Sequence, residues 1–193
     1  MKKLLSVFAM LLALCCLVSC EKTDESAFDE PDVPEGSLVS CEKTDESDFD
    51  EPDVPEGSLA LCVSNVTAKP GETVEVAVKL FDNQKLGGFS FCLVPPEGFT
   101  ASEAKVDMAD NTYSFVKTLE DGSVNFAWTS LTLCTDDRVI ARMNITVPEN
   151  AVPGTYDVKL HFRPQYDMFY TINSDGTMPE YDVVLSHGTI TVE

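Results

Sequence analysis

Short runs that alternate apolar and polar residues fill the chain from Leu59 onward, and they constrain the fold more than any other feature. Successive side chains of a β-strand point to opposite faces, so such alternation predicts half-buried strands. Two runs show it most clearly, over residues 73–81 and 138–147. Their in-phase apolar residues are Val74, Val76, Val78 and Leu80 in the first run, and Val139, Ala141, Met143, Ile145 and Val147 in the second.

Further short runs follow the same pattern and are separated by turn residues. Glu120-Asp121-Gly122 lies between apolar runs at 113–119 and 123–129, which predicts a hairpin turn. Other runs cover residues 89–94, 155–162, 169–172, 181–185 and 189–192. Residues 101–109 are the one weak candidate for a helix. Many short strands with intervening turns predict an all-β sandwich of two sheets and about nine strands over residues 58–193.

The first residues have the layout of a bacterial export signal. Lys2 and Lys3 precede an almost unbroken apolar stretch over residues 4–18, which is too short and wrongly flanked for a stable membrane span. The stretch ends in Leu17-Val18-Ser19-Cys20 and resembles the lipobox of bacterial lipoprotein precursors. This resemblance implies that residues 1–19 are removed and that Cys20 is lipidated. An ordinary secretory signal with an incidental cysteine is the alternative.

A tandem repeat of 21 residues follows, from 17 to 37 and from 38 to 58, and its copies differ only at Ala27 and Asp48. The second copy of the lipobox tetrapeptide ends at Cys41, inside an acidic stretch that cannot enter a membrane. A third echo, Leu-Ala-Leu-Cys, ends at Cys62. A local tandem duplication explains all three tetrapeptides, and Cys41 would then be a copied residue without a role of its own. Its alternative role is a disulfide between neighbouring chains.

The segment 20–57 has the composition of a stalk. Residues 21–57 contain fifteen Asp and Glu against two Lys, with recurrent prolines and few apolar residues. Such a segment buries too little apolar surface to offset the entropy of ordering, so it is predicted to be disordered and extended. Fully stretched, it would reach roughly 120 Å. It would then hold the domain off the envelope, or serve more simply as an acidic solubility tail.

Charge and cysteine content limit the function of the remaining domain. Of the formal net charge of −20, residues 58–193 carry −9, which argues against nucleic acid or anionic lipid as a partner. Cys62, Cys92 and Cys134 match no zinc spacing. They are interpreted as small apolar packing residues, although two of them could pair.

Several segments together resemble the cohesin family, and they cover essentially all of residues 59–193. Residues 66–78 and 87–91, VTAKPGETVEVAV and GGFSF, resemble its opening, and 124–128 with 139–147, VNFAW and VIARMNITV, resemble its middle. Residues 148–160 and 188–192, PENAVPGTYDVKL and GTITV, resemble its end. The resemblance implies a jelly-roll sandwich of about nine strands that binds dockerins, the small calcium-loaded modules of polysaccharide-degrading enzymes in cellulosomes.

The resemblance also implies where a partner would bind. The recognition strands map to Leu86, Gly87 and Gly88, and to Thr129, Ser130, Leu131 and Thr132. Calcium would belong to the dockerin, so no cofactor or metal is implied for this chain. Two positions depart from better-known members: Gly87-Gly88 stands where many have Asn or Asp, and Pro95-Pro-Glu-Gly98 replaces an aromatic-Asp-Pro turn.

The sequence offers little support for catalysis. His161 and His187 lie in no catalytic or metal spacing, and no nucleophile elbow, phosphate loop or zinc motif is present. Residues 171–182 partly match the pattern of a calcium-binding loop, with Asn173, Asp175 and Gly176 at its third, fifth and sixth positions. The first ligand would be Thr171, however, so an Asp-Gly turn is the better interpretation. We therefore expect a protein without enzymatic activity.

Aromatic residues leave a second binding function open, namely direct carbohydrate binding. Trp128, Tyr113, Tyr156, Tyr166, Phe169 and Tyr170 are the candidates for a stacking platform, and residues 165–170 form a polar-aromatic loop. The preferred hypothesis is a lipoprotein exposed at the cell surface whose domain captures dockerin-bearing proteins. The alternatives are a lipoprotein that binds glycan directly and a structural envelope domain with another protein partner.

Overall fold

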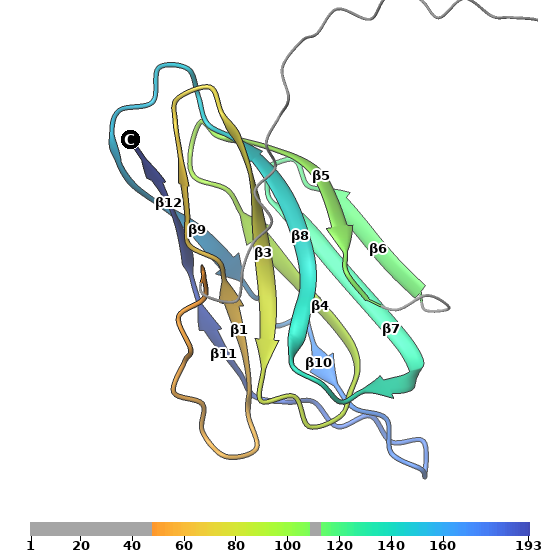
Figure 1. Cartoon of the computed structure of the whole chain (residues 1–193). Helices are drawn as coiled ribbons and strands as arrows, with labels where there is room; N and C mark the ends of the chain where they lie inside the picture. Colours follow the sequence, from red (N-terminus) through yellow and green to blue (C-terminus); the bar gives the residue numbers. More distant parts are fainter. Residues whose placement is uncertain (1–47, 109–112) are drawn as a thin grey trace, which may run out of the picture. The chain divides into compact units, whose positions relative to one another are not determined.

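The computed structural model describes residues 48–108 and 113–193, so the predicted signal peptide, Cys20 and Cys41 lie outside the described residues. In these two ranges the chain forms twelve strands in two sheets, which confirms the all-β sandwich (Figure 1). This part of the chain contains no helix with the length and apolarity needed to span a membrane. The three strands beyond the predicted nine lie at Leu59–Val63, Val66–Ala68 and Thr100–Val106, where no run was singled out from the sequence.

The first sheet has the order β11-β1-β3-β8-β5. Its strands are β1 (Leu59–Val63), β3 (Thr73–Phe81), β5 (Thr100–Val106), β8 (Arg138–Thr146) and β11 (Val183–Ser186). All five residues of β1 are buried between β3 and the parallel strand β11. β5 covers most of the weak helix candidate at 101–109, so this segment forms a strand and not a helix.

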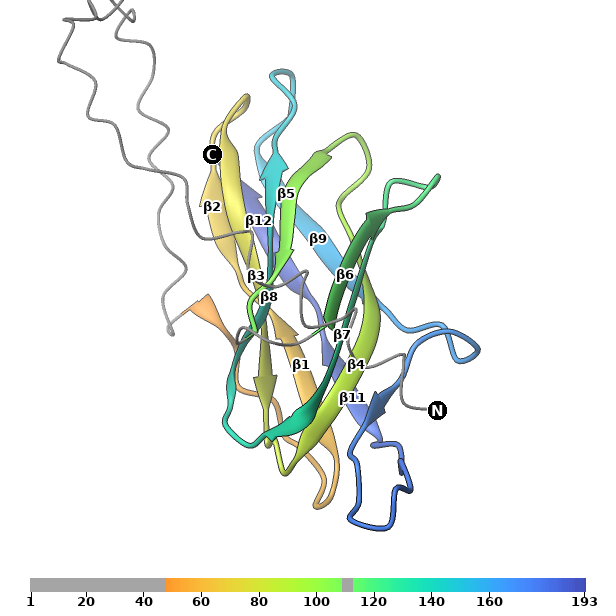
Figure 2. The same ribbon diagram turned by 90° about the vertical axis from the view of Figure 1, so that its right-hand side faces the viewer.

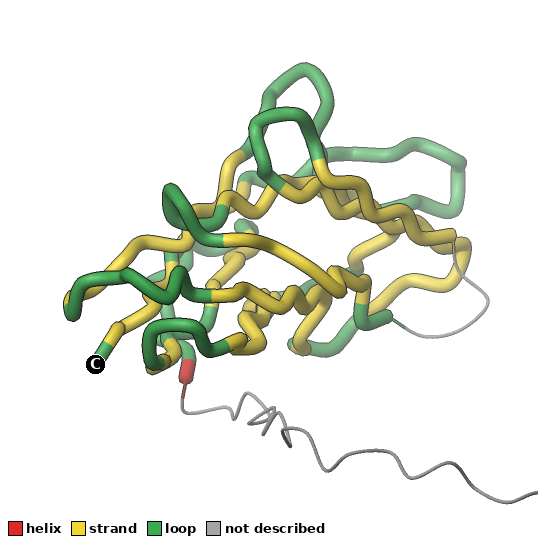
Figure 3. Tube along the Cα trace, turned by 90° about the horizontal axis from the view of Figure 1, so that it is seen from above, coloured by secondary structure: helices red, strands yellow, loops and turns green. Residues whose placement is uncertain are grey.

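The second sheet has the order β2-β12-β9-β4-β7-β6, and β10 pairs with β4 beside this path. Its strands are β2 (Val66–Ala68), β4 (Leu86–Val94), β6 (Tyr113–Thr118), β7 (Val124–Cys134), β9 (Gly154–His161), β10 (Phe169–Tyr170) and β12 (Gly188–Val192). Figure 2 shows β6, β7 and β4 in one layer and β5, β8 and β3 in the other. The view from above in Figure 3 shows the two layers of strands.

Two short interruptions let the chain pass from one sheet to the other. β1 belongs to the first sheet and β2 to the second, and Ser64 and Asn65 lie between them. The Ala77 N–H donates to Ser64 Oγ at 3.0 Å, and the Thr189 N–H donates to Asn65 Oδ1 at 3.1 Å. The break between β11 and β12 makes a second crossing. Both crossings therefore connect the two layers of the sandwich.

The core lies between the sheets and is built from the in-phase apolar residues. Val76, Val78 and Leu80 are fully buried, as the alternation predicts. β8 departs from strict alternation, because a β-bulge opposite Val78 and Lys79 inserts Ile140 into the core. Val139 is left only half-buried. Phenylalanines of the second sheet fill the middle, with the Phe91 and Phe126 rings 5.4 Å apart.

Residues 48–50, near the end of the predicted stalk, contact the sandwich. The Asn65 N–H donates to the Asp48 carbonyl at 2.8 Å, and Asn65 Nδ2 donates to Asp50 Oδ2 at 3.0 Å. The Lys79 ammonium lies 5.9 Å from the centre of the Phe49 ring. Residues 48–50 therefore differ from the extended tether that the composition of the segment predicts.

Candidate functional site

The two predicted recognition segments lie side by side in the second sheet. β4 and β7 pair antiparallel, with Gly88 opposite Thr129 and Leu86 opposite Cys134. From Leu86 to Gly88 β4 advances two residues while β7 advances five, so residues 130–133 form a large bulge opposite Gly87. Thr132 N–H donates to Ser130 Oγ within it at 3.0 Å, and Leu131 is 96% exposed. The structure thus brings the predicted residues together, and their role in binding stays a prediction.

The predicted residues differ in what they present to solvent. Leu86 is completely buried. A Cβ atom on Gly88 would overlap the ring of Tyr170, and one on Gly87 would lie 2.9 Å from Ile172 Cγ1. Such close approach requires glycine at these positions. The exposed part of the predicted set is therefore the bulge of β7, because side chains outside the set cover the two glycines.

We call the outward side chains of β4, β6 and β7 the outer face. Val124, Phe126 and Trp128 of β7 point into the core, so the alternating residues Asn125, Ala127 and Thr129 point outward. Across the ladder, Tyr113 lies opposite Thr129 and Phe115 opposite Ala127. Their exposed fractions are 70% and 43%.

This outer face suits contact with another macromolecule more than chemistry. Exposed aromatic side chains on a rigid sheet are typical of surfaces that bury against a partner. The charged residue among these outward positions is Lys117, which lies opposite Asn125. An apolar surface with hydroxyl groups and one ammonium can provide binding energy when a partner buries it.

A buried carboxylate attaches the segment around β10 to this face. The Asp167 side chain is fully buried and accepts hydrogen bonds from Arg163 Nη2 at 2.7 Å and from Arg163 Nε at 2.9 Å. Ser90 Oγ donates to Asp167 Oδ1 at 2.9 Å, and Asn125 Nδ2 donates to Ser90 Oγ at 3.3 Å. The network therefore links β7, β4 and the segment before β10.

The charge of Asp167 is stabilised by these donors. Burial alone would raise the pKa of Asp167, but the Arg163 side chain, the Arg163 backbone N–H and the Ser90 hydroxyl hold the pKa below its usual value. The same pair raises the pKa of Arg163. Asp167 is thus an ionised structural anchor at neutral pH, with all its partners inside the protein.

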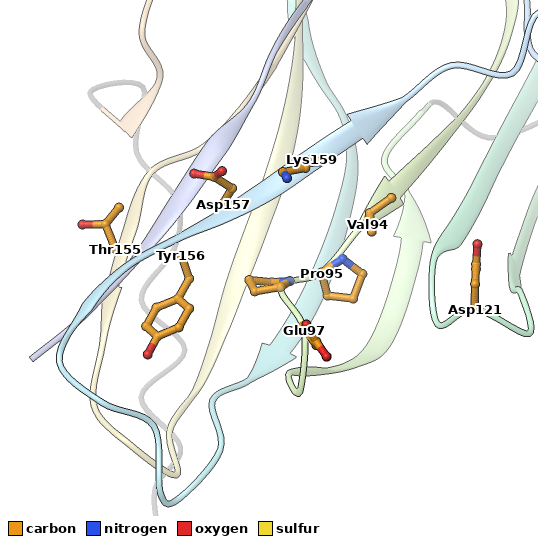
Figure 4. A pocket seen from close by; sticks show the side chains of 9 residues that line it. Val94, Pro95, Glu97, Asp121, Thr155, Tyr156, Asp157 and Lys159 are labelled. Atoms are coloured by element: carbon orange, nitrogen blue, oxygen red, sulfur yellow. The ribbon is translucent and has the colours of Figure 1, made fainter.

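A hollow of about 550 Å³ lies at the other end of the sheet (Figure 4). Tyr156, Asp157 and Lys159 of β9 line it, together with Glu97 after β4 and Asp121 from the β6–β7 turn. Figure 4 shows Asp121 well apart from the β9 side chains. Within the described residues, no cluster of three or more His, Cys, Asp or Glu side chains is placed to hold a metal ion. We assign no chemistry to this hollow.

The two histidines and the segment that resembles a calcium loop were also singled out from the sequence. His161 is exposed on β9, and His187 Nδ1 accepts a hydrogen bond from the Leu160 N–H at 3.1 Å. The segment that echoes a calcium loop is a tight turn in which Thr177 N–H and Oγ1 both donate to Asp175 Oδ1. This confirms the interpretation as a turn.

The cysteines inside the described residues are unpaired and largely buried. Cys62 and Cys92 are buried and Cys134 is half-buried, all as free thiols. Burial raises the pKa of Cys62 to about 11, so this thiol is protonated at neutral pH. The interpretation as small apolar packing residues is confirmed for Cys62 and Cys92, and the alternative of a disulfide between two of the three is not found among the described residues.

Sequence reasoning missed the residues that build this face around β10. Within the polar-aromatic loop 165–170, Tyr166 and Met168 are exposed whereas Asp167 and Phe169 are buried. Period-two alternation was the available signal, with Arg163 at i−4 as the partner of the inward acid. The aromatic platform is also divided, because Trp128 and Phe169 belong to the core.

Comparisons with known proteins agree with this architecture. A family model described as Cohesin domain matches residues 59–192. No curated protein matches the chain. Among solved structures, the seventh ScaB type I cohesin from Pseudobacteroides cellulosolvens is 16% identical with a TM-score of 0.61, covering 70% of this chain and 92% of that one.

Two further solved structures come from different organisms. A type I cohesin–dockerin complex from Clostridium thermocellum is 19% identical with a TM-score of 0.58, covering 70% of this chain and 99% of that one. A non-cellulosomal cohesin from the archaeon Archaeoglobus fulgidus is 14% identical with a TM-score of 0.55, covering 70% and 90%. At these identities the structural likeness concerns the fold alone.

Proposed function

The chain belongs to the cohesin family, and from this premise we propose that it is a non-catalytic module that captures dockerin-bearing proteins on its outer face. Relatives in the family have been solved in complex with dockerins. The observation that carries the proposal is the exposed apolar surface of β6 and β7, with Tyr113 at 70% and Leu131 at 96% exposure. Burying it on a partner would remove this apolar area from water.

The rest of the chain supports an anchored adaptor. On this proposal a lipid on Cys20 holds the protein on the outer side of a bacterial membrane, and the acidic segment spaces the domain from it. The captured proteins would be polysaccharide-degrading enzymes that carry dockerins. The protein would then hold the enzymes at the cell surface and would not itself catalyse a reaction.

Calcium-dependent capture tests the binding proposal. The purified full-length protein is immobilised and exposed to secreted proteins of the source organism, with calcium or with a chelator. We expect dockerin-bearing proteins, identified by mass spectrometry, to be retained in calcium and released by chelation, since the dockerin holds the calcium. Retention of no dockerin-bearing protein would contradict the proposal. Retention of the protein on insoluble polysaccharide would instead support direct carbohydrate binding.

Fatty-acid labelling in cells tests the anchor, and the duplicated tetrapeptide supplies a matched control. We expect Cys20→Ala to abolish incorporation of a labelled fatty acid, because the lipid attaches to that thiol. Cys41→Ala removes the same residue type from the same local sequence and should leave labelling unchanged. Persistent labelling of Cys20→Ala, or its loss in Cys41→Ala, would assign the anchor elsewhere.

A further inference from the structure

The glycine pair at the start of β4 supports side chains from other elements. The ring of Tyr170 lies on Gly88, and Ile172 and Leu133 both approach Gly87, where an added Cβ would be 2.9 Å from Ile172 Cγ1 and 3.3 Å from Leu133 Cδ2. Ile172 and Leu133 are half-buried and lie outside the core cluster. We call Tyr170, Ile172 and Leu133, with the exposed Leu131 of the same bulge, the glycine patch.

The position of Tyr170 is fixed from two directions. Its backbone pairs with Gly88 through the β10–β4 ladder. Its hydroxyl lies 2.6 Å from Thr129 Oγ1, so the side chain reaches across β4 to β7. A ring held by backbone pairing and by a hydrogen bond loses little further conformational entropy on binding. Such preorganised aromatic residues are typical anchors of interfaces.

One carboxylate borders the glycine patch. Glu180 pairs with Tyr170 across an isolated antiparallel bridge. Directly opposed residues in such a pair project to the same side, so the exposed Glu180 side chain lies on the side of Tyr170. An apolar centre with a negative charge beside it fits a partner surface that presents apolar side chains next to a Lys or Arg.

We infer that Tyr170, seated on Gly88, is the anchor through which this domain selects its dockerin, with Leu131 and Ile172 as apolar neighbours and Glu180 as the charged one. The inference rests on the proposed function and adds the chemistry of the partner. The recognised dockerin presents an apolar surface beside a basic residue. The glycines of β4 act by leaving room for the ring, and they make no side-chain contact themselves.

A double-mutant cycle on the full-length protein tests this assignment, with affinity for a captured dockerin-bearing protein as the readout. Tyr170→Ala removes the ring, and we expect affinity to fall at least tenfold. Gly88→Ala should weaken binding because its methyl group displaces the ring. In the Gly88→Ala/Tyr170→Ala variant the methyl group should cost nothing further, because no ring remains to be displaced. Val152→Ala, which truncates an apolar side chain of 68% exposure outside the glycine patch, serves as the matched control.

The thermal midpoint of each variant separates binding from folding. A loss of affinity in Tyr170→Ala with a nearly unchanged midpoint supports the inference, as does a weaker salt dependence of binding in Glu180→Gln. If wild type retains dockerin-bearing proteins in calcium and Tyr170→Ala binds them equally well, the inference fails while the proposed function stands. If wild type retains none, both fail. Additive effects of Gly88→Ala and Tyr170→Ala would also overturn the inference.

Discussion

Replacing Asp167 with alanine is expected to lower the free energy of unfolding by about 3 kcal/mol, because it leaves the Arg163 guanidinium without its carboxylate. The Asp167 side chain is fully buried, whereas that of Arg163 is 26% exposed. Water can reach the orphaned cation, so we expect the low end of the range for broken buried pairs. The Ser90 hydroxyl loses its acceptor as well. Denaturant unfolding followed by fluorescence measures the loss.

The pH dependence of the free energy of unfolding provides a second test of the Asp167–Arg163 ion pair. Because the folded state holds the pKa of Asp167 below its usual value, the pair contributes fully above the unfolded pKa of about 3.9. This contribution disappears as the pH falls through the folded pKa. The gap between wild type and Asp167→Ala should therefore be largest near pH 7 and narrow at strongly acid pH. A gap that stays constant, or an equal loss in the exposed control Asp157→Ala, would contradict this role.

Phe91→Ala is expected to lower the free energy of unfolding by about 4 kcal/mol, the middle of the range for phenylalanine truncations in cores. Phe91 is 1% exposed and lies in the middle of the aromatic cluster. Its ring centre is 5.4 Å from that of Phe126, 5.6 Å from that of Phe89 and 6.1 Å from that of Phe169. The alanine leaves a cavity that these rigid rings close only in part.

Phe115→Ala is the matched control for this substitution. Phe115 lies on β6 in the same sheet, but its side chain points to the outer face and is 43% exposed. Its truncation should cost less than about 1 kcal/mol, because solvent already surrounds much of the ring. Chemical denaturation of both variants under one condition gives the comparison. Equal losses would mean that Phe115, too, is part of the core.

Strands with one buried face, such as β3, were predicted from the sequence. The edge strand β5, which forms because it pairs with β8, was not. β3 follows its alternation, because Val76, Val78 and Leu80 gain from the core. β5 contains Ala, Glu and Lys, which favour helix locally, yet it pairs with β8 at the edge of the first sheet. Glu103 sits at a register shift in β5 with a φ of 45°. Pairing of this kind depends on a distant strand and leaves little periodic signal.

The sequence predicted which strands form the candidate site, but it did not predict which side chains make up its surface. The likeness to the family pointed to β4 and β7, which do lie together. Tyr170 covers Gly88, and these two residues are 82 positions apart in the sequence. The local sequence around either residue gives no sign of this contact. Gly87-Gly88 indicates a close approach of some kind but does not identify the group that approaches.

The burial of β1 has a consequence for the duplicated segment that precedes it. A chain shifted by one 21-residue repeat would offer Leu38–Glu42 in place of Leu59–Val63 as the first strand. Three of these five residues suit the buried positions, but Ser40 would replace Leu61 and Glu42 would replace Val63. Burying a carboxylate without a partner is costly. Ser40 and Glu42 therefore make the repeated segment a poor substitute for Leu59–Val63 in the buried first strand.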